Sequence, residues 1–112
     1  MVIRYSDDHD MIAELETKLL SICDRSDELE SRKRRVENII RMDIEIKAED
    51  KTSGLTNEKK RQIAYEEYAD ENGVLQEIIS ELKDVKRREK VLKIEIDNDK
   101  RAFQLKINNV NQ

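Results

Sequence analysis

Apolar residues recur at alternating spacings of three and four in two stretches of the chain, residues 12–40 and 75–103. This heptad spacing places the apolar side chains on one stripe of an α-helix, so it predicts helices that pair lengthwise. Four positions of this stripe hold polar residues instead of apolar ones, namely Ser26, Lys33, Glu89 and Asp99. The predicted packing seam consists of Ile12, Leu15, Leu19, Ile22, Leu29, Val36, Ile40, Leu75, Ile78, Leu82, Val85, Leu92, Ile96 and Phe103.

Two turn signals divide the helical pattern. In KTSGLTNEKK, Gly54 supplies conformational freedom, and Thr56 or Asn57 can cap a new helix. Further along, Asn72-Gly73 in ADENG is a second turn signal, which indicates a break or kink. The chain therefore turns back on itself and then breaks once more.

We predict an all-α fold in a single helical domain that covers residues 1–112. The first helix has Ser6 or Asp7 as its N-cap. The expected architecture is a long antiparallel helical hairpin or coiled coil, kinked near Asn72-Gly73 into a three-helix arrangement. The predicted elements are a helix over 6–50, a turn over 51–56, and helices over 57–71 and 73–108.

The composition agrees with long helices. Charged residues make up 43% of the chain and aromatic residues only 4%, and there is no proline. This suits helices with a narrow buried stripe better than a sphere with a deep core. Disorder is the other interpretation of so much charge, but the regular apolar spacing argues against it. The formal net charge of −4 lacks the positive field of a protein that coats DNA.

Charge blocks suggest how the helices align. The segment 31–41, which begins SRKRR, contains five basic residues and one acid, whereas 66–81 contains acids and no base. A turn near Gly54 would place these segments side by side. We therefore interpret SRKRR as a register signal between the helices. Its alternative role is contact with nucleic acid, for which the candidates are Arg32, Arg34, Arg35, Lys86, Arg87 and Arg88.

No motif predicts catalysis. His9 is the only histidine and lies among aspartates at the expected helix start, while Cys23 lies beside the seam without a second histidine to activate it. The chain lacks a CxxC pair, a glycine-rich phosphate loop and a convergent set of metal ligands. We therefore expect no catalytic residues, no metal site, no cofactor and no enzymatic activity.

The aromatic residues favour contacts with protein. Tyr65 and Tyr68 share a helical face but lie among acids, which would repel phosphate. Packing against the first helix or against a partner protein is the better interpretation. The candidate contacts with a protein partner are Tyr65, Glu66, Glu67, Tyr68, Asp70 and Glu71.

The segment 50–82 resembles small helical coiled-coil proteins of tailed bacteriophages, which are often encoded beside recombination genes. In that pattern a long helix is followed by a lysine, a Thr-Asn-Glu-Lys-like cap, a short helix with Ala and Tyr, and a second long charged helix. The resemblance implies an accessory role in phage DNA metabolism with no catalytic site. The residues that carry it are Lys51, Thr56, Asn57, Glu58, Lys59, Arg61, Ala64 and Tyr68.

The leading hypothesis is a non-enzymatic helical protein-interaction module, a phage accessory protein that acts by binding another protein. The alternatives are a nucleic-acid-binding accessory in phage recombination or replication, and an inhibitor of a host defence nuclease. A purely structural spacer is a further interpretation.

A two-helix hairpin buries little surface, so apolar residues beside the seam indicate further packing partners. We therefore expect a homo-oligomer, a dimer or higher. No apolar run approaches the roughly 20 residues of a membrane span, and the N-terminal sequence is not that of a signal peptide. We expect no membrane contact and a cytoplasmic location, that of the host cell if a phage encodes the protein. The apolar residues beside the seam are Met11, Cys23, Ile39, Met42 and Ile46.

Overall fold

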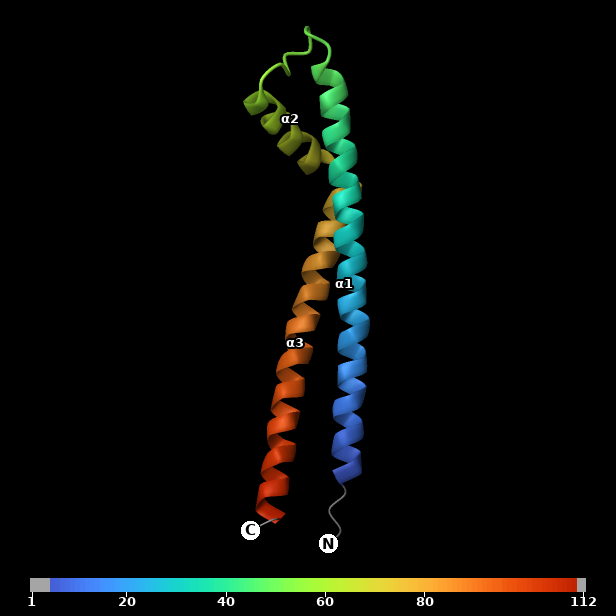
Figure 1. Ribbon diagram of the computed structural model, residues 1–112, viewed down its shortest axis with the longest axis vertical. Coiled ribbons are helices and arrows are strands. Elements are labelled where there is room, and N and C mark those ends of the chain that lie inside the picture. The colour runs from blue at the N-terminus through green and yellow to red at the C-terminus, as the bar shows by residue number, and fades with distance from the viewer. Residues whose placement is uncertain (1–4, 111–112) are drawn as a thin grey trace. The chain divides into compact units, whose positions relative to one another are not determined.

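The computed structural model describes residues 5–110. They form α1 (Tyr5–Ala48), α2 (Glu58–Glu71) and α3 (Gly73–Val110), and these described residues contain no β-strand (Figure 1). The predicted all-α class is confirmed. The helix ends lie within a residue or two of the predicted ones, which is the ordinary variation of helix termini.

The chain divides into two compact units. One unit consists of Met1–Ser26 and Asp84–Gln112, and the other consists of Asp27–Lys83. We call them the terminal unit and the central unit. Helices α1 and α3 contribute to both units, whereas α2 belongs to the central unit alone.

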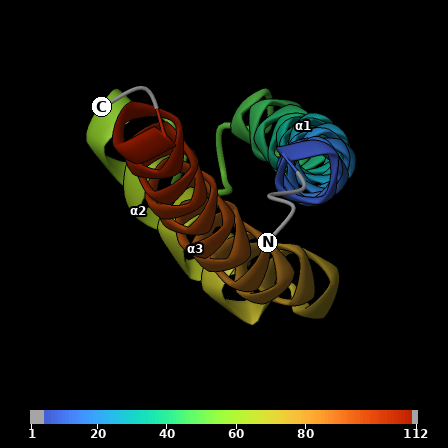
Figure 2. The same cartoon turned by 90° about the horizontal axis from the view of Figure 1, so that it is seen from below.

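In the terminal unit, the first part of α1 and the last part of α3 run antiparallel beside each other (Figures 1 and 2). Lys100 Nζ lies 3.0 Å from Glu16 Oε1, and Lys106 Nζ lies 2.8 Å from Asp8 Oδ2. These contacts join the two helices as a hairpin. The apolar seam residues of this unit are buried or half-buried; they are Ile12, Leu15, Leu19, Ile22, Val85, Leu92, Ile96 and Phe103.

The register of this pair differs from the predicted one. A turn centred near Gly54 would place Lys93 opposite Glu16, but Glu16 pairs with Lys100. The predicted register is therefore wrong by between one and two helical turns. The physical reason is that the chain does not turn only once, because α2 lies between α1 and α3 in the sequence as a separate helix.

All three helices meet in the central unit. Ile40 and Ile44 of α1, Ala64 of α2 and Leu75 of α3 form one buried cluster. Each helix supplies part of this cluster. The break at Asn72-Gly73 therefore ends α2 as a separately packed helix and starts α3. Partly buried apolar residues surround the cluster, namely Val36, Leu55, Tyr65, Tyr68, Ala69 and Ile79. Further buried residues in this unit are Leu29, Ile78 and Leu82.

Short polar side chains define the ends of the helices in the central unit. Gly54 has φ of +78°, in the left-handed region that glycine adopts without a steric penalty. The Asn57 side chain accepts a hydrogen bond from the Lys60 N–H at 2.8 Å, so its predicted role as N-cap is confirmed. Asn72 accepts a hydrogen bond from the Leu75 N–H at 2.9 Å and so caps the start of α3.

The start of α1 lies earlier than predicted. The helix already includes Tyr5, so the prediction that Ser6 or Asp7 is the N-cap is wrong: both residues lie inside the helix. His9 and Asp10 are exposed, and His9 Nδ1 lies 4.0 Å from a carboxylate oxygen of Asp10. Within residues 5–110, no group of three or more His, Cys, Asp or Glu side chains is arranged to hold a metal ion.

Candidate functional site

The basic residues that the sequence proposed for nucleic-acid contact are divided between the two units. Each of them is exposed, as expected for residues that contact a partner. Those of the central unit are Arg32, Arg34 and Arg35, and those of the terminal unit are Lys86, Arg87 and Arg88.

The interpretation of SRKRR as an internal register signal is wrong. In the described part of the chain, no ion pair joins Arg32, Arg34 or Arg35 to a carboxylate. The reason is the placement of α2, which contacts α1 beyond the basic run, at residues 37–47. The acids of α2 therefore do not lie beside the arginines.

The two tyrosines of α2 hold this helix on α1. The Tyr65 hydroxyl donates a hydrogen bond to Glu37 Oε2 at 3.1 Å, and the Arg41 guanidinium lies 4.9 Å from the Tyr65 ring centre. Lys47 Nζ lies 4.7 Å from the Tyr68 ring centre. Burial raises the pKa of Tyr65, and its hydrogen bond with Glu37 raises that pKa further. Both tyrosines thus make cation–π and polar contacts within the chain.

The other residues proposed for contact with a protein partner are acids of α2, and one of them, Glu71, borders a pocket against α1 together with Tyr68. These acids are exposed, in contrast to the half-buried tyrosines. This leaves an acidic, solvent-facing surface on α2 that consists of Glu66, Glu67, Asp70 and Glu71.

Cys23 lies on one flank of the terminal-unit seam. It is half-buried and forms a hydrogen bond with Glu89, whose carboxylate also lies 2.9 Å from Lys93 Nζ. The hydrogen bond from Lys93 lowers the pKa of Glu89, and the Cys23 thiol adds a smaller effect in the same direction. Lys93 and Cys23 thus stabilise the charged carboxylate of Glu89, which interrupts the apolar seam.

We expect Glu89→Gln to lower the free energy of unfolding by about 0.5 kcal/mol at neutral pH. The pKa of Glu89 is lower in the folded chain, so its stabilisation is complete above the unfolded-state pKa. That stabilisation is lost as the pH falls through the folded-state pKa, and the gap between wild type and variant should close in acid. Urea unfolding at several pH values measures the gap, with the exposed Glu95→Gln as a control. If the difference in free energy of unfolding between wild type and Glu89→Gln did not change with pH, the lowered pKa of Glu89 would not stabilise the fold.

Ion pairs cover one flank of the terminal-unit seam. Glu16 and Lys100 both occupy e positions of their heptads, and they pair across the seam at 3.0 Å. Lys93, another e residue, pairs with Glu89 at 2.9 Å. Because e positions face one another in antiparallel helices, these charged side chains lie over the apolar contact on this flank.

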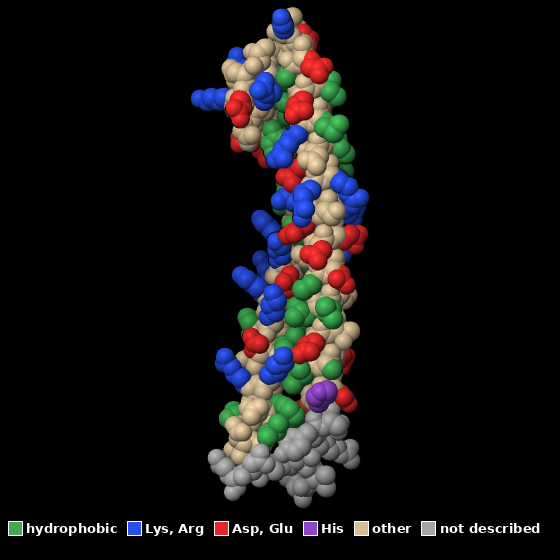
Figure 3. All heavy atoms as spheres, viewed as in Figure 1, with side chains coloured by type: hydrophobic (Ala, Val, Ile, Leu, Met, Phe, Trp, Pro, Cys, Tyr) green, Lys and Arg blue, Asp and Glu red, His purple; other side chains and the backbone are tan. Residues whose placement is uncertain are grey.

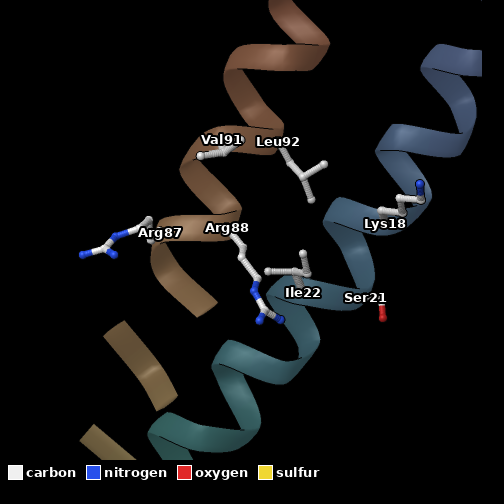
Figure 4. Close-up of a pocket in the computed structure, with 7 residues that line it drawn as sticks. All are labelled: Lys18, Ser21, Ile22, Arg87, Arg88, Val91 and Leu92. Atoms are coloured by element: carbon white, nitrogen blue, oxygen red, sulfur yellow. The ribbon is translucent and has the colours of Figure 1, made fainter. Parts of the chain in front are cut away.

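The opposite flank is open. Lys18 of α1 and Arg88 of α3 occupy g positions on this flank and border the same groove, and Lys18 forms an ion pair within its own helix, 3.8 Å from Glu14. Figure 4 shows Ile22 and Leu92 directed toward each other between the helices, while Arg87 extends away from them. The result is a groove of about 510 Å³, lined by Lys18, Ser21, Ile22, Arg87, Arg88, Val91 and Leu92.

This groove has an apolar floor and a basic rim. Ile22, Val91 and Leu92 supply the apolar side chains, and Val91 is 56% exposed although it adjoins the seam. No carboxylate lines the groove. Such a surface is suited to binding apolar groups that carry negative charge nearby.

Three groove residues are not among the sequence-based candidates, namely Lys18, Ser21 and Val91. Two signals in the sequence point to them. Val91 is an apolar residue directly beside the seam residue Leu92, and Lys18 and Arg88 are like charges at g positions. These signals become informative only when the pairing of α1 with α3 is known.

The fold and the groove define an all-α protein of the helical hairpin or coiled-coil class, with one open seam flank in its terminal unit. No protein-family model, curated protein or solved structure matches the chain. Among the described helices, none has a stretch that is both long and apolar enough to span a bilayer. The chain's own surfaces are therefore the basis for inferring its function.

Proposed function

We propose that the protein is a non-enzymatic helical interaction module and that its terminal-unit groove receives an amphipathic helix of a partner protein. The observation that carries the proposal is the difference between the two seam flanks: ion pairs cover one, whereas apolar residues line an open groove on the other. Amphipathic helices bind such grooves through apolar anchors at helical spacing. Ile22, Val91 and Leu92 would receive these anchors.

The charge of the rim determines which helix fits. Lys18, Arg87 and Arg88 line the groove and no carboxylate does, although Lys18 pairs with Glu14, which lies outside the lining. Asp or Glu residues beside the apolar anchors of a partner would complement this rim. A second copy that docked groove to groove would instead bring identical cations together. The groove is thus better suited to an acidic helix of another protein than to itself.

We expect a labelled helical peptide with Leu anchors and Glu flanks to bind the full chain about tenfold more tightly than the same peptide with Lys flanks. Fluorescence anisotropy measures both affinities. Val91→Asp should weaken binding of the Glu-flanked peptide by about tenfold or more, because it places a charge on the apolar floor.

The matched control is Ile94→Asp. Ile94 is exposed to a similar degree, 61% against 56% for Val91, and it lies on the same helix but outside the groove. Circular dichroism verifies that both variants are folded. Equal binding of the two peptides, or equal weakening by the two substitutions, would overturn the proposed function.

The alternative is nucleic-acid binding, which the exposed and unpaired Arg32, Arg34 and Arg35 favour. Labelled single- and double-stranded DNA can be titrated in the same assay. Binding that weakens steeply with salt, and that is lost when all three arginines are changed to Ala, would support this alternative. An accessory role in a phage and inhibition of a host defence nuclease concern the identity of the partner, and both stay predictions.

A further inference from the structure

A second apolar stripe lies on α1 in the central unit. Ile39, Met42 and Ile46 are 65%, 61% and 64% exposed, and their spacing of three and four is that of a heptad. Figure 3 shows hydrophobic side chains along the edge of the upper part of α1 that faces away from α2, with Lys and Arg side chains below them. The groove in the terminal unit does not include this stripe.

The stripe lies beside the face of α1 that packs within the chain, and Ile39 borders a pocket there with Ile40 and with Tyr68 of α2. Ile40 is 5% exposed and Ile44 is 2% exposed, and both belong to the buried cluster shared with α2 and α3. Ile39, directly next to Ile40, faces outward instead. Helix α1 thus carries two apolar faces in the central unit, and α2 and α3 cover only one of them.

Charged residues continue the outer stripe at the same spacing. Arg35 lies four residues before Ile39, and Glu49 lies three residues after Ile46. The Glu49 N–H still donates to the Glu45 carbonyl oxygen at 3.2 Å, so Glu49 extends the helical turn. The stripe is therefore basic at one end, apolar in the middle and acidic at the other end.

We propose that this stripe is the interface of an antiparallel dimer of two copies of the chain, with the two-fold axis at Met42. An isologous contact pairs the same surface on both copies, so the ends of the stripe must complement each other. Antiparallel pairing brings Arg35 of each copy beside Glu49 of the other. Parallel pairing would instead place Arg35 beside Arg35 and Glu49 beside Glu49, which is unfavourable.

In this dimer the arginines of the SRKRR run form ion pairs with the second copy rather than within their own chain. Arg34 and Arg35 would face the acidic end of the second copy, where Glu49 and Asp50 lie. Only three apolar residues of each copy lie on the stripe, so the dimer should be weak and dependent on concentration. The proposal is independent of the groove, because it uses different residues in the other unit.

Sedimentation equilibrium of the full chain over a range of concentrations tests the proposal. We expect a monomer–dimer equilibrium for the wild type, and a dissociation constant about tenfold or more higher for Met42→Asp. Arg35→Glu and Glu49→Arg should each weaken the dimer, because each creates two like-charge contacts. The double variant Arg35→Glu/Glu49→Arg should restore the dimer, because the swapped charges pair again.

The control is Val74→Asp, which changes an exposed apolar residue of the same unit outside the stripe. It should leave the dimer unchanged, as should Val91→Asp in the groove. A wild type that stays monomeric at every concentration would overturn the proposal. The stripe would then be a surface for binding a different protein. A double variant no better than the single ones would also overturn it, because the two side chains would then not meet.

Discussion

Leu75→Ala is expected to lower the free energy of unfolding of the central unit by about 2–5 kcal/mol. Leu75 is 2% exposed and lies in the cluster with Ile40, Ile44 and Ala64, where all three helices meet. Truncation removes contacts with both other helices and leaves a cavity. The aromatic and polar contacts that hold α2 on α1 limit how far the helices can move to fill it.

Urea unfolding followed by circular dichroism measures this loss. Val74→Ala is the matched control, because Val74 is the preceding residue of α3 and is 58% exposed. The control should change the free energy of unfolding by about 0.5 kcal/mol or less. Losses of similar size for the two variants would mean that Leu75 does not lie at the centre of a packed cluster.

Ile96→Ala should have the next largest effect, a loss of about 2 kcal/mol from the terminal unit. Ile96 is 5% exposed, so its side chain is removed from water almost completely. This unit consists of only two helices, however, and the neighbouring seam residues Leu92 and Phe103 are half-buried. Water and neighbouring side chains can therefore enter the space, and the loss should be smaller than that for Leu75→Ala.

The chain offers a close control for this change. Ile94→Ala removes the same atoms two residues away, at a position that is 61% exposed. The same urea titration should show a change of about 0.5 kcal/mol or less. If Ile94→Ala destabilised the chain as much as Ile96→Ala, the orientation of α3 in the terminal unit would be wrong.

Much of the local structure could be predicted because it depends on residues close together in the sequence. The heptad spacing of apolar residues marked the helical face that α1 and α3 bury, since a helix brings such residues to one side. Asn57 was identifiable as one of two candidate caps because a cap bonds a backbone N–H three residues ahead, whereas Asn72 was identified only as part of a turn signal. Gly54 was predictable for a similar reason, because its positive φ is a property of the turn itself.

The candidate site was predictable only in part. Arg87 and Arg88 stood out as a basic pair, but the groove they line also needs Lys18 from α1. Which residues of α1 meet them depends on the register, and the register predicted from charge blocks was wrong. Surface ion pairs contribute about 0–1 kcal/mol each, too little for charge blocks to determine the register by themselves.

By itself, the sequence determined the helices, their breaks and the residues of the seam, because helical periodicity and capping act over a few residues. Only the tertiary structure decided that α2 packs on α1 beyond SRKRR, that Glu16 meets Lys100, and that one seam flank stays open. These features depend on contacts between residues distant in sequence. The buried cluster of Ile40, Ile44, Ala64 and Leu75 joins all three helices, and burying its apolar side chains contributes more free energy than the surface charges.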